Sequence, residues 1–452
     1  MKKILVAVIA VLIIIGVGGV FFTKSQVKSQ IQNITQNVVG NMQGVEITKD
    51  EMKQSLTQTD GSVEITIKGD EFKKSFGDRF ETFFKGVLSA DTINTAKQNL
   101  SSGGNIADIH VKYDYSVSHS PLGVANGFTS NGKITFLDKD IADGLKEIFG
   151  TDAPILLDIN QGLMSRHTDV KFVDINVDNK GKVAGLVFGF DASNDNQISK
   201  AGLRIADINI LDKSTQIKIG GVDINYNFDK PLNGNNINLV DLVFSDISDD
   251  MSIKDVSISS SLGVIKLSDI TSKGTQKVDG DMIVSGGEMN IKTLSFNKYS
   301  LKNANLDLYV KLPEKAMREL YTNIDDATTA KIEKYNKDMF KNLVLDVKNF
   351  SIQTPNDEKI SLTFNIKATG FDEVKEIPLM VLNGDIQTTG TLQDLANGFN
   401  DPQLSGMATL YDAIVKAQTM PNGKGYKATF GFDSITNKAK FNNQEVDLNN
   451  PF

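Results

Sequence analysis

The chain of 452 residues carries 48 Lys and Arg against 56 Asp and Glu, a net charge of −8. Such an acidic chain has no basic stripe, so we expect no nucleic-acid partner. It contains no cysteine. That excludes disulfides, thiolate metal sites and cysteine nucleophiles.

An uncharged apolar run extends from Ile4 to Phe22, directly after Lys2 and Lys3. As a helix it would be about 28 Å long, close to the thickness of the hydrocarbon core of a bilayer. The run exceeds a usual secretory signal in length, and no small-residue cleavage site follows. We therefore predict an uncleaved transmembrane signal-anchor over 1–23, with a cleaved signal as the alternative. Its signal-like position predicts a single-pass membrane protein with most of the chain outside the cytoplasm.

Residues 24–44 have one apolar stripe at helical spacing on an otherwise polar segment, formed by Val27, Ile31, Ile34, Val38 and Met42. This pattern predicts a helical neck that packs on the following domain. A coiled-coil stalk is the alternative, although the stripe lasts only about two heptads.

The segment 45–300 is dominated by alternation of apolar and polar residues, which predicts an exported, β-rich domain. The alternating stretches are 63–67, 109–117, 170–178, 206–212, 215–228, 251–260 and 288–296. One Phe-rich stretch instead fits a helix face, with Phe72, Phe76, Phe80, Phe83 and Val87 in line. Asp-Ile-Asn occurs at 158–160, 174–176, 207–209 and 223–225. Because Asp and Asn favour turns, we expect short strands here, and Gly220-Gly221 predicts a β-bulge.

The segment 301–452 repeats this pattern as a C-terminal β-rich domain with helices near 313–339 and 407–418. Pro313 is expected at the first position of the earlier helix. Strands are predicted around 306–312, 343–347 and 362–366, and two closing strands over 426–435 and 438–448. The fold class is thus mainly β (α+β). A transmembrane helix precedes an elongated antiparallel domain, built as a curled sheet or a sandwich, with a few inserted helices. A groove filled by lipid would also cover the apolar strand faces.

Few residues suggest chemistry. His110, His119 and His167 stand outside any catalytic or metal-binding motif. Residues 191–202 place Asp191, Asp195 and other oxygen ligands as a calcium loop would, but Gly202 replaces the bidentate Glu. In such a loop Asn196 would adopt the left-handed turn usually given to Gly. A polar hairpin turn is the alternative. We predict no catalytic, cofactor-binding or metal-binding residue, no cofactor, and no enzymatic activity.

Two C-terminal stretches carry a family resemblance. The stretch 305–320, NLDLYVKLPEKAMREL, is similar to a strand-then-helix unit of the YdgA-like family of bacterial envelope proteins. The ending 423–448 resembles that family's ending, with Asn442-Asn443 where the family tends to have Asn-Gly. FFKGVLSAD, at 83–91, resembles its N-terminal strand motif. If so, part of the Phe-rich stretch is strand.

The resemblance covers the anchor and about 300–452. It implies an inner-membrane-anchored envelope protein of unknown function with a β-rich exported domain. More distantly, the architecture resembles AsmA-type proteins, whose sheets curl into apolar grooves thought to handle lipids. No site residue carries over. We expect a non-enzymatic periplasmic protein that either shelters lipid in envelope maintenance or acts as a structural, protein-binding scaffold of the envelope.

Overall fold

The computed structural model describes residues 45–446, apart from 70, 72–80, 82–90, 96, 98–106, 121–122, 178–179, 194, 213, 235–238, 323–333, 336 and 375. The predicted signal-anchor (1–23) and neck (24–44) lie outside this range. So do the five aligned residues of the predicted Phe-rich helix. Within the described residues, no helix has the length and apolar character needed to cross a bilayer.

The chain forms two compact units. Unit 1 comprises residues up to Leu211 together with Gly221–Val243, and unit 2 comprises Asp212–Gly220 together with Phe244–Phe452. Strand β11 (Thr215–Asn233) therefore contributes to both. Position 300, where the sequence suggests a change of segment, lies inside unit 2, within the second strand of a hairpin.

Unit 1 is built on an antiparallel ladder in which β1 pairs with β2, β2 with β3, and so on through β6, which pairs with β9 and then β10. Two short strands extend β10, since β8 pairs with it and β7 pairs with β8. The strands are β1 (Val45–Gln54), β2 (Gln58–Ile67), β3 (Ile109–Ser120), β4 (Gly123–Phe136), β5 (Ile155–Gln161), β6 (Ser165–Phe172), β7 (Ile175–Val177), β8 (Gly181–Ala184), β9 (Val187–Ser193) and β10 (Gln197–Asp212).

One face of the unit 1 ladder is covered and forms a closed core. Helix α5 (Lys139–Phe149) buries Ile141 and Leu145 against this core, and Leu145 has no exposed surface. Phe136 and Ile155 beside it are 1% and 0% exposed. The predicted alternation over 63–67 and 109–117 is confirmed, because the apolar members of both strands face this core.

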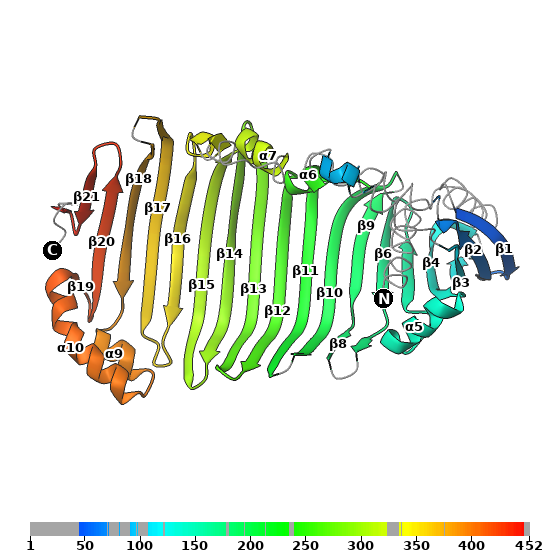
Figure 1. The fold of residues 1–452 in the computed structure, drawn as a ribbon, viewed down its shortest axis with the longest axis horizontal. Helices are drawn as coiled ribbons and strands as arrows, with labels where there is room; N and C mark the ends of the chain where they lie inside the picture. Colours follow the sequence, from blue (N-terminus) through cyan, green and yellow to red (C-terminus); the bar gives the residue numbers. More distant parts are fainter. Residues whose placement is uncertain are drawn as a thin grey trace. The chain divides into compact units, whose positions relative to one another are not determined.

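Unit 2 is a longer antiparallel ladder in which consecutive strands pair from β12 to β18, followed by β20, β21 and β22. Figure 1 shows it as a single open layer, with short helices at the ends of the strands. It is thus a curled sheet and not a sandwich. The strands are β12 (Ile247–Ser260), β13 (Gly263–Asp279), β14 (Met282–Phe296), β15 (Tyr299–Pro313), β16 (Val344–Gln353), β17 (Lys359–Asp372), β18 (Ile377–Thr388), β19 (Met420–Asn422), β20 (Gly425–Asp433), β21 (Lys438–Phe441) and β22 (Gln444–Val446).

The helices of the described residues are short connections. Those with both ends described are α5, α6 (Leu239–Val243), α7 (Glu314–Thr322), α9 (Leu392–Asn397) and α10 (Pro402–Gln418), and residues 91–95 and 337–339 are helical as well. Pro313 ends β15, so the placement of Pro313 inside the helix is wrong by one residue. The helix predicted near 407–418 begins at Pro402, because Asp401 caps it. Helix α9 was not predicted; Thr391 and Asp394 form its capping box.

The expectation of short strands with Asx-rich turns is wrong. β10, β11 and β13 contain 16, 19 and 17 residues, and Asp-Ile-Asn lies inside strands β5, β10 and β11. At 174–176 only its last two residues belong to a strand, β7. Paired neighbours satisfy the backbone along the full length of these strands, and this outweighs the weak strand propensity of Asp and Asn. Gly221 has a φ of 59°, as the predicted bulge requires.

A row of irregular positions crosses four strands of unit 2. Each of these strands has one extra residue, after which the alternation of apolar and polar residues shifts by one position. Because of this extra residue, the apolar residues before it and after it lie on the same face of the sheet. The extra residues are Lys254, Asp269, Lys292 and Asn303. Asp269 and Asn303 have φ values of 47° and 48°. The extra residues lie on the polar face, where Lys292 Nζ is 3.2 Å from Asp269 Oδ2. Extra length on one face bends a sheet toward the other, apolar face.

Candidate functional site

The sheet of unit 2 has a continuous apolar face on β15–β18 and β20. Residues that are directly opposite on paired strands share a face of a sheet. Three such rows contain only apolar residues and one glycine, and we call these residues the apolar face. The first row is Leu306, Phe350, Leu362, Ile386 and Ala428; the second is Leu308, Val347, Phe364, Gly384 and Phe430; the third is Val310, Leu345, Ile366, Leu382 and Phe432.

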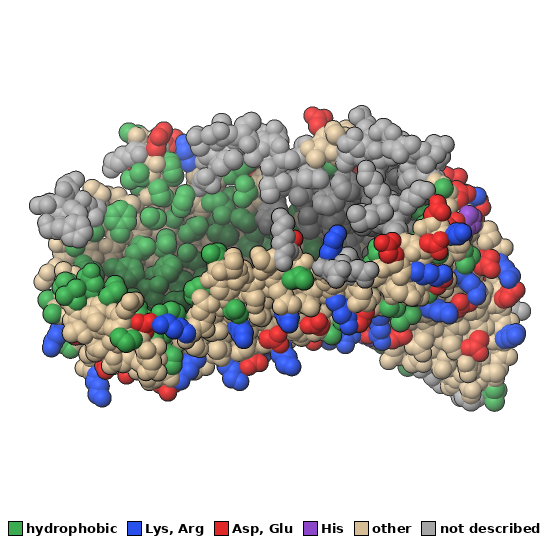
Figure 2. Space-filling view, turned by 60° about the horizontal axis from the view of Figure 1, so that its bottom comes forward, with side chains coloured by type: hydrophobic (Ala, Val, Ile, Leu, Met, Phe, Trp, Pro, Cys, Tyr) green, Lys and Arg blue, Asp and Glu red, His purple; other side chains and the backbone are tan. Residues whose placement is uncertain are grey.

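The apolar face is incompletely covered. Phe350 and Ile386 are 40% and 42% exposed, and most other members are half-buried. Figure 2 shows the corresponding surface as a hollow lined by hydrophobic side chains, over the region of β14–β20. The curvature of the sheet thus gathers apolar side chains into a trough.

Gly384 shapes the middle of this face. A Cβ added to Gly384 would lie 2.5 Å from Phe430 Cζ and 2.6 Å from the backbone oxygen of Thr363. Only glycine leaves room for the Phe430 ring to lie across the neighbouring strand. The ring then closes what would otherwise be a gap in the apolar surface.

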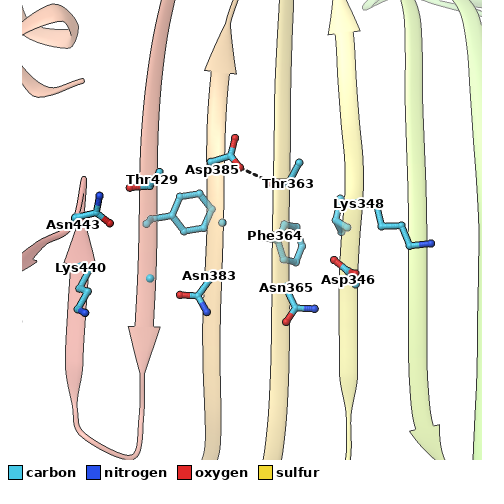
Figure 3. A pocket seen from close by; sticks show the side chains of 14 residues that line it. Asp346, Lys348, Thr363, Phe364, Asn365, Asn383, Asp385, Thr429, Lys440 and Asn443 are labelled. Carbon is cyan, nitrogen blue, oxygen red and sulfur yellow. Dashed lines mark hydrogen bonds between the residues drawn. The ribbon is translucent and has the colours of Figure 1, made fainter. Parts of the chain in front are cut away.

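The opposite face of the same strands is polar and forms a shallow pocket of about 550 Å³. One row of this face contains Asp346, Asn365, Asn383 and Gly431, with Lys440 following on β21. Figure 3 shows Asp346, Asn365, Asn383 and Lys440 side by side on neighbouring strands. A second polar hollow of about 370 Å³ includes Asn290, Asn305 and Asn349, whose amides hydrogen-bond in series.

The polar pocket contains a carboxylate that is held ionised. Thr363 Oγ1 donates to Asp385 Oδ2 over 2.7 Å, as Figure 3 shows, and Gln387 Nε2 donates to Oδ1 over 2.5 Å. Burial by itself raises the pKa of Asp385, but these two hydrogen bonds and Lys427 outweigh it, so the pKa is lowered. A carboxylate with a lowered pKa is a poor proton donor at neutral pH.

Helix α10 is fixed at the end of unit 2 by two aspartates. The Asp401 carboxylate accepts hydrogen bonds from Lys298 Nζ (2.8 Å) and Tyr299 Oη (2.6 Å), and it also caps the helix. These bonds hold the pKa of Asp401 well below its usual range. Asp412, in the C-terminal half of α10, accepts from the Leu392 backbone N–H (3.0 Å) and Tyr426 Oη (2.7 Å). Burial, with the bond to Asp412, raises the pKa of Tyr426 to about 12.

The three histidines lie in unit 1 and do not meet. His110 Nδ1 is 2.9 Å from Asp138 Oδ1, and His119 Nε2 is 3.3 Å from Thr59 Oγ1. His167 lies between two carboxylates, with Nδ1 2.6 Å from an Asp191 oxygen. These are contacts between neighbouring strands and between a strand and a helix cap.

The possible calcium loop at 191–202 is a β-hairpin. It joins β9 to β10, and Asn196 has a φ of 62°, which confirms the left-handed turn. Asp191 is engaged with His167 instead of pointing into the loop. In the described ranges, no group of three or more His, Cys, Asp or Glu side chains is arranged to hold a metal ion.

A family model for bacterial proteins of unknown function, DUF945, matches residues 1–346. The chain belongs to this family. No curated protein and no solved structure matches the chain. The match includes all of unit 1 and the strands of unit 2 as far as Asp346.

The sequence suggested a lipid-filled groove as one alternative, but the residues of the apolar face were not predicted because they form no chemical motif. The signal in the sequence was the alternation of apolar and polar residues, together with the Phe and Leu residues on β15–β18 and β20. Sequence shows that one face of each strand is apolar, but not whether another layer covers it. Chemically, an open apolar trough can bind aliphatic chains, since each buried methylene contributes about 0.8 kcal/mol.

Proposed function

We propose that unit 2 binds the acyl chains of lipids on its apolar face, without catalysing a reaction. The supporting observation is the set of three aligned apolar rows, left half-exposed, with no charged residue among them. A soluble sheet normally covers such a face. An acyl chain would supply the missing layer.

The dimensions suit this ligand. The apolar face crosses five strands, about 19 Å at a spacing of about 4.8 Å, and its three rows extend over about 14 Å along the strands. The acyl chains of one leaflet extend over about 15 Å. Ten methylenes buried in the trough would contribute about 8 kcal/mol. Binding would be selective for length and saturation more than for head group, because the three rows offer no polar partner.

We also propose that the apolar run 4–22 anchors this protein in the inner membrane and that the two units lie in the periplasm. The length of the run, its lack of charge and its place after Lys2 and Lys3 support this. An anchored lipid-binding sheet would lie close to the membrane lipids that it binds. This location is consistent with a role in maintaining the envelope.

The test is a titration of the full chain, in detergent, with a fluorescent fatty-acid analogue. The variant Phe350→Glu/Ile386→Glu places two charges in the first row. We expect its affinity to fall by at least about tenfold, which corresponds to 1.4 kcal/mol. Both positions are exposed enough to accept the change without unfolding, and far-UV circular dichroism checks this.

The matched control is Lys348→Glu/Asn383→Glu, on the same two strands but on the polar face. We expect it to bind as the wild type does. Equal affinity for all three proteins, or no binding by the wild type, would contradict acyl-chain binding. In the latter case, cross-linking in cells to a defined protein without lipid would favour the envelope scaffold.

A further inference from the structure

The side of unit 2 that carries the apolar face changes its character on the strands before β15. The three rows of the apolar face continue across β14, β13 and β12, because residues directly opposite on paired strands share a face. On these strands the first row contains Met289, Ser272 and Met251, the second Gly287, Gly274 and Asp249, and the third Ser285, Gln276 and Ile247. The apolar face is therefore bordered, on the same side of the sheet, by a polar region.

Asp249 is the one charged side chain in the three rows, over the described strands from β12 to β20. It is half-buried, and its carboxylate lies over the neighbouring strand, since a Cβ added to Gly274 would be 2.5 Å from Asp249 Oδ1. The residues that the structure describes give Asp249 no hydrogen bond and no ion pair. A half-buried carboxylate normally accepts from a donor, because its lost contact with water is costly unless a hydrogen bond replaces it.

Two polar neighbours of Asp249 are engaged elsewhere. Ser285 Oγ donates to Gln276 Oε1 over 3.4 Å, and Gln276 Nε2 donates to the backbone oxygen of Ser245 over 3.2 Å. Gly287 leaves the next position in the row of Asp249 without a side chain, and Leu308 of the apolar face follows it. Two strand spacings, about 10 Å, thus separate the strand under the carboxylate from the strand on which the apolar face begins.

The residue next to Asp249 has different surroundings. Asp250 lies on the opposite side of the same strand, where it is exposed and stands opposite Lys273. Its charge therefore has both water and a cation nearby. The two adjacent aspartates differ in the side of the sheet that they occupy, and only Asp249 faces the region beside the apolar face.

We propose that Asp249 binds the ammonium group of an amphiphile whose alkyl chain lies on the apolar face. This recognition rests on the proposed function and extends it by naming the polar end of the ligand. An ammonium group supplies both the positive charge and the N–H donors that the carboxylate lacks. A carboxylate or phosphate group would find no cation in the three rows. Chain length still sets most of the affinity, and Asp249 adds a preference for one kind of polar end.

The test compares three ligands that share one alkyl chain. The full chain, in a neutral detergent at pH 7, is titrated by calorimetry with dodecylammonium, dodecanol and dodecanoate. We expect dodecylammonium to bind at least about fivefold more tightly than dodecanol, because charge-assisted hydrogen bonds are stronger than neutral ones. Dodecanoate should bind no more tightly than dodecanol, because its carboxylate must stay away from Asp249.

Asp249→Asn keeps the shape of this side chain and removes its charge. In this variant dodecylammonium should bind no more tightly than dodecanol, while the affinity for dodecanol should equal that of the wild type. A general disturbance of the sheet would instead weaken the binding of both ligands. Asp250→Asn is the matched control, because it is the same substitution on the opposite side of the strand, and it should keep the preference for dodecylammonium. Far-UV circular dichroism checks that both variants fold.

The outcomes separate this recognition from acyl-chain binding. Recognition of the ammonium group is overturned if the wild type binds dodecylammonium and dodecanol equally, or if Asp249→Asn keeps the preference. Acyl-chain binding survives either result, because dodecanol reports on the apolar face alone. If none of the three ligands binds to the wild type, both acyl-chain binding and recognition of the ammonium group are overturned.

Discussion

The two units use the same antiparallel strands but treat their apolar faces differently. In unit 1 the face is covered, and Ile67, Leu145 and Ile155 have no exposed surface. In unit 2 three aligned apolar rows remain half-exposed, and Phe350 and Ile386 retain about 40% of their surface. Alternation of apolar and polar residues therefore produces an apolar face in both units, but the face contributes fully to stability only where the fold covers it. Unit 1 encloses its apolar face in a core, and unit 2 leaves its apolar face partly exposed.

The largest loss of stability is expected for a substitution in the closed core of unit 1. Phe136 is 1% exposed, so Phe136→Ala should leave a cavity and lower the free energy of unfolding by about 3–5 kcal/mol. Urea unfolding followed by far-UV circular dichroism measures this. A loss below about 1 kcal/mol would mean that the core of unit 1 is as loosely packed as the apolar face of unit 2.

Replacing Arg166 should have a smaller effect and should raise the free energy of unfolding. Its side chain is 2% exposed, and in the described part of the chain Nε and Nη2 have no hydrogen-bond partner. Replacing a buried charge by an apolar residue of similar size should remove a desolvation cost, so Arg166→Met should stabilise unit 1 by about 1–3 kcal/mol. A destabilised variant would show that the guanidinium has a strong partner.

The same substitution has a pH signature. Burial lowers the pKa of Arg166 to about 10. The folded state therefore releases this proton more readily than the unfolded state, so wild-type stability gains as pH rises above about 10. The advantage of Arg166→Met should be complete at neutral pH and shrink above pH 10. Melting temperatures at pH 8 and pH 11 check this.

Replacing the N-cap residue of α10 should lower the melting temperature of unit 2 in a pH-dependent way. Asp401→Asn removes a carboxylate whose folded pKa is lowered, so its contribution is present above the unfolded pKa of about 4 and lost as pH falls toward the folded value. The variant should melt below the wild type at pH 7, and the gap should narrow at pH 3. A gap independent of pH would mean that geometry, and not charge, makes the contribution.

The smallest effect is expected on the apolar face. Ile386 is already 42% exposed, so Ile386→Ala loses little burial and creates no enclosed cavity. The cost should be about 1 kcal/mol. Val347→Ala, on the same face but 6% exposed, is the control and should cost more per methyl group removed. If Phe136→Ala and Ile386→Ala lowered the free energy of unfolding equally, the apolar faces of the two units would not differ in how well they are covered.

Sequence reasoning predicted the strands well where one face is buried. Val63, Ile65 and Ile67 alternate with polar neighbours, and they form β2 as expected. It failed at Asp-Ile-Asn, because local preference for turns is weaker than pairing on both sides of a strand. It also missed the register, which places Leu308, Val347 and Phe364 in one row through contacts far apart in the sequence.

The apolar stripe of α10 was likewise visible only in part. Met407, Leu410 and Ile414 stand at helical spacing, and the usual interpretation is that they pack inward. They instead face solvent, because the other side of the helix is held to the sheet: Asp401 accepts from Lys298, 103 residues earlier, and Asp412 accepts from Tyr426, 14 residues later. A single sequence does not show these pairings.

The row of Lys254, Asp269, Lys292 and Asn303 divides each of four strands into two halves with opposite phases. Removing one residue from within either half of such a strand would turn the adjoining segment over and exchange its faces. Apolar side chains would then lie among asparagines, and lysines would enter the trough. We therefore expect unit 2 to tolerate insertions in its hairpin loops, while a single-residue deletion within these strands should abolish folding of the whole layer.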